Sequence, residues 1–254
     1  MTLQTLLGIE LPIIQAPMAG VQGSALAVAV SNTGALGSLP CAPLSLEDLR
    51  KELAAIRAQT AKPVNVNFFC HASPTPSAER EAIWRAKLAP YYQEFGLDIR
   101  AIPEGSGRAP FTTEAADIVR EFKPAVVSFH FGLPSTELLS RVQAWGSKVL
   151  SSATTVEEAR WLEAHGVDAV IAQGFEAGGH RGMFLSDDLS TQVGTLALVP
   201  QMVKTSRFRS SQPGGSPMPR VLRLRWRLAR PVCRSERLTC FVPKPRPVRS
   251  TAPR

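Results

Sequence analysis

The residues best suited to chemistry lie in one short stretch, AQGFEAGGHRG at positions 172–182, directly after the apolar run VDAVI. Its four glycines, Gly178 and Gly179 at the centre, let backbone N–H groups approach a ligand and allow positive φ. A concave row of such groups forms a cradle for an anion or a phosphate. His180 can act as a general base near neutral pH or as a cation beside an anionic substrate. The same glycines also suit an ordinary turn, so both interpretations stand at this point.

Amide side chains offer a second kind of chemistry. Gln173 and Asn67 each donate and accept hydrogen bonds at once, as the recognition of a polar heterocycle requires. Asn65 and Asn67 share the run VNVNFF, and we take their side chains to face opposite ways along a strand. We therefore place Asn67 in the site and expect Asn65 to face away from it.

Three further residues have open roles. His130, in SFHFG, suits either a hydrogen-bonded core histidine or a residue of the substrate pocket. Met18 suits either core packing or a ligand-facing turn, because Pro17 and Gly20 flank it closely. Ala19 lies in the same turn and is a second candidate for the substrate pocket.

Short apolar runs alternate with amphipathic segments over residues 1–203, which predicts parallel βαβ units. Ser45 and either Thr112 or Thr113 are the expected helix N-caps. Six such strands fit a doubly wound sheet or an incomplete eight-stranded barrel, and both place function at the carboxyl ends of the strands. The predicted strands are 11–17, 35–39, 63–69, 124–132, 148–154 and 167–174.

The basic charge of the chain belongs to one segment. Residues 204–254 hold 14 of the 29 lysines and arginines and a single acid, Glu236, whereas residues 1–203 carry a net charge of −5. The body is therefore a mildly acidic protein, and because the basic segment carries no RNA-binding motif we expect no nucleic-acid partner. Four cysteines without metal or redox spacing, no apolar run of membrane-spanning length and no secretory signal predict a cytoplasmic protein without a metal.

Four motifs in order, QAPMAGV, NVNFF, SFHFGLP and AQGFEAGGHRG, resemble those of the nitronate monooxygenase family over residues 6 to about 203. The resemblance implies a TIM-type barrel that binds FMN and oxidises alkyl nitronates with O2 to a carbonyl compound and nitrite. It implies that Met18, Asn67, Gln173 and Gly178, with Gly179 beside it, contact FMN, and that His180 is the catalytic histidine. FMN-dependent NAD(P)H:quinone or enoyl reductases, and an inactive product, remain alternatives, and the sequence predicts no oligomeric state.

The resemblance stops near residue 203, where the family requires two more βα units. Residues 204–254 are instead rich in arginine, with proline at eight of 51 positions. In a shifted reading frame, each new codon starts one base before the next original codon, so the following residue sets its last two bases. This frame is compatible with V-P-V-V-A-A-G-G-I and then V-G-T-A-Y-L, which are sequences that the family would have there. We therefore expect a frameshift near residues 202–204. The predicted division is a partial FMN-binding barrel over 1–203 and a disordered or out-of-frame tail over 204–254, with both edges of the sheet open.

Overall fold

Five parallel strands form the centre of the structure, a computed structural model that describes residues 2–73, 75, 77–101, 109–205 and 239–243. The strands pair with their neighbours in sequence order, so each connection crosses over through a helix. This is the predicted α/β architecture of a partial barrel. The strands are β1 (Gly37–Pro40), β2 (Val64–Phe69), β3 (Val126–His130), β4 (Lys148–Ala153) and β5 (Ala169–Gln173).

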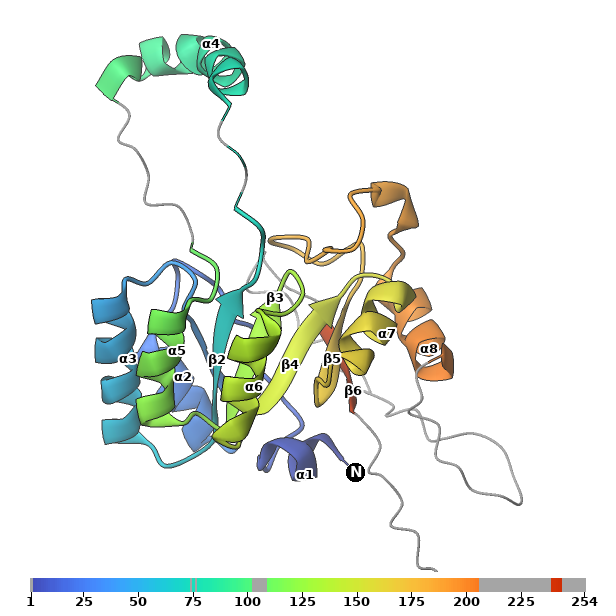
Figure 1. Cartoon of the computed structure of the whole chain (residues 1–254). Coiled ribbons are helices and arrows are strands. Elements are labelled where there is room, and N and C mark those ends of the chain that lie inside the picture. Colours follow the sequence, from blue (N-terminus) through green and yellow to red (C-terminus); the bar gives the residue numbers. More distant parts are fainter. Residues whose placement is uncertain (1, 74, 76, 102–108, 206–238, 244–254) are drawn as a thin grey trace, which may run out of the picture.

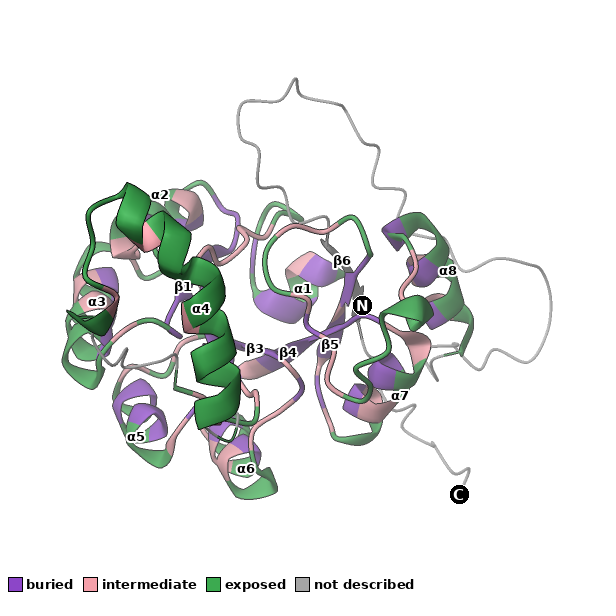
Figure 2. Ribbon diagram, turned by 90° about the horizontal axis from the view of Figure 1, so that it is seen from above, coloured by how far each residue is buried: buried purple, intermediate pink, exposed green. Residues whose placement is uncertain are grey.

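Helices cover the outer face of this curved sheet, and Figure 2 shows them as an arc around the strands. The strand residues that face them are apolar and buried, among them Val66, Val127 and Val170. The predicted caps at Ser45 and Thr112 are confirmed, because each hydroxyl accepts a hydrogen bond from the amide three residues on. The helices of the arc are α2 (Ser24–Asn32), α3 (Leu46–Gln59), α5 (Thr113–Phe122), α6 (Thr136–Ala144), α7 (Val156–Ala164) and α8 (Thr195–Thr205).

The first predicted strand, 11–17, is reduced to a single parallel bridge between Ile14 and Leu36. Only Ile13 and Gln15 exchange backbone hydrogen bonds with Leu36. Pro12 and Pro17 bracket these residues, and proline has no N–H with which to extend a ladder. The expectation of six strands was therefore wrong at this position, although the chain still follows the edge of β1.

The inner face of the sheet is divided into two layers. Its lower layer is apolar and packs on α1 (Leu3–Leu7), a short helix that the sequence analysis did not predict and that closes the floor of the barrel (Figure 1). Its upper layer, toward the carboxyl ends, is polar. The lower residues are Leu36, Val126, Leu150 and Ala169, and the upper ones are Ser38, Asn65, Asn67, Ser128, His130, Ser152 and Gln173.

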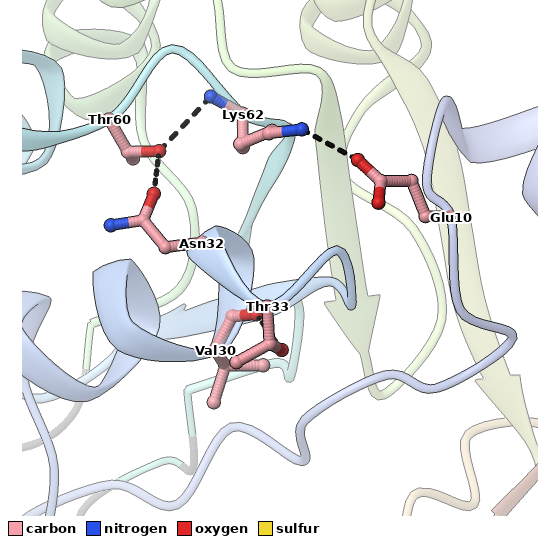
Figure 3. Close-up of polar contacts among 6 residues, drawn as sticks. All are labelled: Glu10, Val30, Asn32, Thr33, Thr60 and Lys62. Atoms are coloured by element: carbon pink, nitrogen blue, oxygen red, sulfur yellow. Dashed lines mark hydrogen bonds and ion pairs between the residues drawn. The ribbon is translucent and has the colours of Figure 1, made fainter.

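Polar contacts fasten the loops at the amino-terminal edge of the sheet (Figure 3). The Thr60 hydroxyl lies 2.7 Å from Asn32 Oδ1 and accepts the backbone N–H of Lys62, whose ammonium lies 2.6 Å from Glu10 Oε1. The hydrogen bond from Lys62 is the main cause that holds the pKa of Glu10 below its ordinary value. These contacts join the ends of α2 and α3 to the N-terminal segment.

A sixth strand, β6 (Thr239–Pro243), pairs antiparallel with β5, with Ile171 opposite Phe241. The sequence analysis predicted no strand there and expected both edges of the sheet to be open, so for the β5 edge that expectation was wrong. The predicted boundary at residue 203 falls inside α8, which ends at Thr205. The remainder of the predicted tail lies outside the described residues.

Helix α4 (Ala78–Glu94) stands away from the body on the carboxyl side of the sheet and is almost wholly exposed (Figures 1 and 2). It begins at Ser77, whose hydroxyl accepts the amide of Arg80. Among the described residues no helix is long and apolar enough to cross a membrane.

Candidate active site

A cavity opens at the carboxyl ends of the strands, above the apolar floor. The space between its walls is about 540 Å³ and includes solvent at the open mouth. Three of the predicted site residues line it, namely Asn67, His130 and Gln173. The rest of its wall comes from Ile14, Gln15, Ala16, Pro17, Asn65, Ser128, Phe129, Leu150, Ser152 and Ile171.

Both asparagines of β2 line this cavity, so the expectation that Asn65 faces away was wrong. Residues two apart on a strand share a face, since side chains alternate at every residue. Asn67 donates through Nδ2 to the backbone carbonyl and hydroxyl of Ser128, at 3.2 and 2.9 Å. Asn65 donates to Ser38 Oγ at 3.0 Å, and its Oδ1 has no hydrogen-bond partner among the described residues.

Gln173 ties the glycine-rich loop to the end of β5. Its Nε2 donates to the backbone carbonyl of His180 at 2.9 Å, and its Oε1 accepts the backbone N–H of Gly182 at 2.7 Å. A Cβ at Gly182 would lie 2.5 Å from His130 Cε1 and 3.1 Å from Gln173 Oε1, so only glycine fits here. The side-chain carbonyl and one N–H of Gln173 are thus hydrogen-bonded to the loop, and its second N–H is available to other partners.

His130 supports the same carbonyl from the other side. Its Nε2 lies 3.0 Å from the backbone oxygen of His180, and its Nδ1 is hydrogen-bonded to Ser152 Oγ. A carbonyl oxygen only accepts, so Nε2 must carry a proton, and the neutral ring then accepts from the serine through Nδ1. His130 was expected to be either a hydrogen-bonded core histidine or a residue of the substrate pocket. In the structure it is buried and hydrogen-bonded, and it also lines the cavity.

The His180 side chain is exposed and is not among the residues that line the cavity. Its ring centre is 5.4 Å from that of Phe69 and 6.0 Å from that of Phe131, edge-on to both. His71 contacts the same two phenylalanines at 6.1 and 6.0 Å. Phe131 has a φ of 66°, which is rare for an aromatic residue and typical of functional sites.

Two carboxylates that the sequence analysis did not single out fasten the flanks of the loop. Glu158, on α7 and 1% exposed, accepts the backbone N–H of Thr154 at 2.6 Å and that of Phe184 at 2.7 Å. Glu176 accepts the first backbone N–H of α8, that of Thr195, at 3.0 and 3.1 Å. The hydrogen bond from its own backbone N–H is the main cause that lowers the pKa of Glu176. A glutamate three residues after the N-cap Thr155 fits the capping-box pattern, which could have drawn attention to Glu158.

The remaining predicted residues lie around the rim. Met18 and Ala19 follow the cavity residue Pro17 and are half-buried. Gly178 is half-buried and Gly179, with a φ of 77°, is exposed in the loop that carries His180. The structure thus gathers Asn67, His130 and Gln173 in the wall and leaves the other candidates at its edge.

The described residues contain no group of three or more potential metal ligands. Burial raises the pKa of the Cys41 and Cys70 thiols, which disfavours the reactive thiolate. The polar side chains that line the cavity carry amides, hydroxyls and the His130 imidazole.

Comparison with known proteins completes this description. The family model for nitronate monooxygenase matches residues 1–208. The nitronate monooxygenase of Paraburkholderia phytofirmans is 44% identical over 215 residues, which cover 83% of this chain and 58% of the relative. That of Pseudomonas aeruginosa is 45% identical over 199 residues, covering 76% and 56%. The chain thus spans little more than half the length of these relatives.

Solved structures show the same likeness. A nitroalkane oxidase from Streptomyces ansochromogenes superposes with a TM-score of 0.70 at 36% identity, over 82% of this chain and 58% of that one. FabK from Thermotoga maritima superposes with a TM-score of 0.55 at 28% identity, over 80% and 50%.

Proposed function

The chain belongs to the nitronate monooxygenase family, and we propose that it oxidises alkyl nitronates with O2 to a carbonyl compound and nitrite, using FMN. Residues 1–203 form the flavin-binding unit in this proposal, and the substrate is a small molecule in the cytoplasm. The observation that carries it is that Gln173 and His130, which both line the polar cavity, contact the backbone carbonyl of His180.

The cavity residues fit a flavin ring. The ring system presents carbonyl acceptors and an N–H donor, and the wall offers amides that both donate and accept. Asn65 Oδ1, buried and without a partner among the described residues, is an acceptor of the kind that such a ring would satisfy. In the proposed arrangement Met18, Asn67, Gln173, Gly178 and Gly179 hold FMN, which supplies the electron acceptor for the oxidation.

The protein's own part in the reaction is to bind the substrate and to hold a proton. A nitronate is already an anion, so it needs no C–H abstraction, and a protonated His180 would stabilise its charge. A neutral nitroalkane first has to lose its α-proton, which the neutral His180 ring would accept. In this proposal Ala19 and His130 border the substrate, and Phe69 and Phe131, which contact the His180 ring, exclude water from it.

The test compares the two substrate forms in a His180→Asn variant. We expect the turnover of the neutral nitroalkane to fall by about 100-fold or more, with a smaller loss for the preformed nitronate. His165→Gln is the matched control, because this exposed histidine stacks on Trp161 at 3.7 Å, outside the cavity. Equal losses for both substrates would contradict the role of His180 as a base.

Anaerobic mixing tests the reaction class itself. Bleaching of the flavin by a nitronate supports the monooxygenase, whereas rapid bleaching by NADH or NADPH alone would instead support an FMN-dependent quinone or enoyl reductase. A chain that binds no flavin would be the inactive product.

A further inference from the structure

We propose that Asn65 is a second amide that binds the flavin ring, its side-chain carbonyl accepting a hydrogen bond from ring N3–H. This inference rests on the proposed function, because it takes a flavin to be the occupant of the cavity. The oxidised isoalloxazine ring has a single N–H donor, at N3, between two carbonyls.

Asn65 has a buried side-chain oxygen that a ligand could satisfy. The residue is 2% exposed, lines the cavity, and has a side-chain oxygen without a partner among the described residues. A buried acceptor that finds no donor loses its hydration without compensation. A donor from a bound molecule would restore the missing hydrogen bond.

The Asn65 amide contacts its neighbour on β1 through the side-chain nitrogen. Asn65 Nδ2 donates to Ser38 Oγ at 3.0 Å, and the two residues pair in register across β1 and β2. Gln15 holds the backbone of Ser38, with Oε1 accepting the Ser38 N–H at 3.2 Å and Nε2 lying 3.4 Å from the Ser38 carbonyl. With its nitrogen engaged by Ser38, the Asn65 carbonyl is the part of this amide that is left to accept a hydrogen bond.

The other amides of the cavity wall have partners of their own. Asn67 Nδ2 is engaged by Ser128, and Gln173 uses both its oxygen and its nitrogen on the glycine-rich loop. Among the amides that line the cavity in the described residues, Asn65 is the one whose carbonyl is both buried and without a hydrogen-bond partner. A ligand with an N–H flanked by carbonyls matches it, and a ligand in which that N–H is methylated does not.

The experiment measures dissociation constants of FMN and of 3-methyl-FMN for the full chain, by quenching of flavin fluorescence. We expect the wild type to bind FMN about 10- to 100-fold more tightly than 3-methyl-FMN, the ratio that one buried and unsatisfied acceptor produces. Asn65→Leu should remove this preference and bind both flavins equally. Asn32→Leu, which alters an exposed asparagine at the opposite edge of the sheet, should keep it.

The outcomes separate the two proposals. A wild type that binds both flavins with equal affinity overturns the role of Asn65, as it would if a water molecule satisfied the carbonyl, and leaves the flavin site standing. A folded wild type that binds neither flavin overturns the proposed function. If Asn65→Leu fails to fold, Asn65→Ser withdraws the carbonyl while keeping a polar group beside Ser38, and a preserved preference in that variant also refutes the inference.

Discussion

The buried carboxylate of Glu158 yields the sharpest stability prediction. Its Oε2 accepts the Thr154 backbone N–H at 2.6 Å and the Thr154 hydroxyl at 2.8 Å, while its Oε1 accepts the Phe184 backbone N–H at 2.7 Å. Glu158→Gln keeps the shape but turns one of the two oxygens into an NH2 group that faces donors. The hydrogen bonds to that oxygen are therefore lost, and those to the remaining oxygen become neutral hydrogen bonds.

The magnitude follows from these contacts. A hydrogen bond to a charged group contributes about 1.5–3 kcal/mol and a neutral one about 0.5–1.5 kcal/mol. The variant loses one charged contact and weakens the others, while removal of the buried charge recovers part of its desolvation cost. We expect a net loss of about 2–4 kcal/mol in the free energy of unfolding, or roughly 4–16 °C in the melting temperature.

Urea unfolding followed by far-UV circular dichroism measures this loss as a lower midpoint with an unchanged slope. Glu157→Gln is the control, since that neighbouring glutamate is exposed and its replacement should change stability by less than about 0.5 kcal/mol. The reasoning is refuted if the two variants unfold at the same urea concentration.

Four further outcomes are expected. Lys123→Gly should stabilise the protein by about 0.5–1 kcal/mol in chemical denaturation, because this exposed C-cap of α5 has a φ of 46°, where glycine is less strained. Gly37→Ala should lower stability by about 3 kcal/mol in the same assay, since its Cβ would lie 1.9 Å from a backbone oxygen of α2. The pKa of Glu176 is lower in the folded than in the unfolded state, so the unfolded state binds more protons as the pH falls. Denaturant unfolding across pH should therefore show that the wild type is more stable than Glu176→Gln above about pH 4.5, and that this difference vanishes as the pH drops through the folded pKa. DNA sequencing across codons 198–210 should reveal a one-base change of frame, and an undisturbed in-frame gene in the source DNA would contradict it.

Local patterns predicted most of the fold, because they depend on the residues that form each element. The strand residues that face the helices, such as Val66, Val127 and Val170, are apolar, and the caps at Ser45 and Thr112 follow the ordinary chemistry of helix starts. The elements that were missed depend on distant contacts. Helix α1 is only five residues long and is stabilised by packing under the barrel, and β6 forms through pairing with β5 far along the chain.

The candidate site divides in the same way. The loop glycines, Gln173 and His130 stood out by type and position, and the structure brings Gln173 and His130 together around one carbonyl. Asn65 was assigned to the wrong face by an incorrect count along the strand, not by any ambiguity in the sequence. The capping-box spacing after Thr155 pointed to Glu158 but not to its second partner, Phe184, which lies 26 residues away.

The inner face of the sheet has an apolar lower layer and a polar upper layer, and this division has a consequence for protein engineering. The leucines that α1 buries contribute to folding, while Asn67, Ser128 and Ser152 contribute to the cavity one layer above. Substitutions at Ser128 or Ser152 would reshape the cavity, but each of these serines also holds a neighbour, Asn67 or His130. Substitutions in the apolar lower layer should mainly lower thermal stability, except at Leu150, which also lines the cavity.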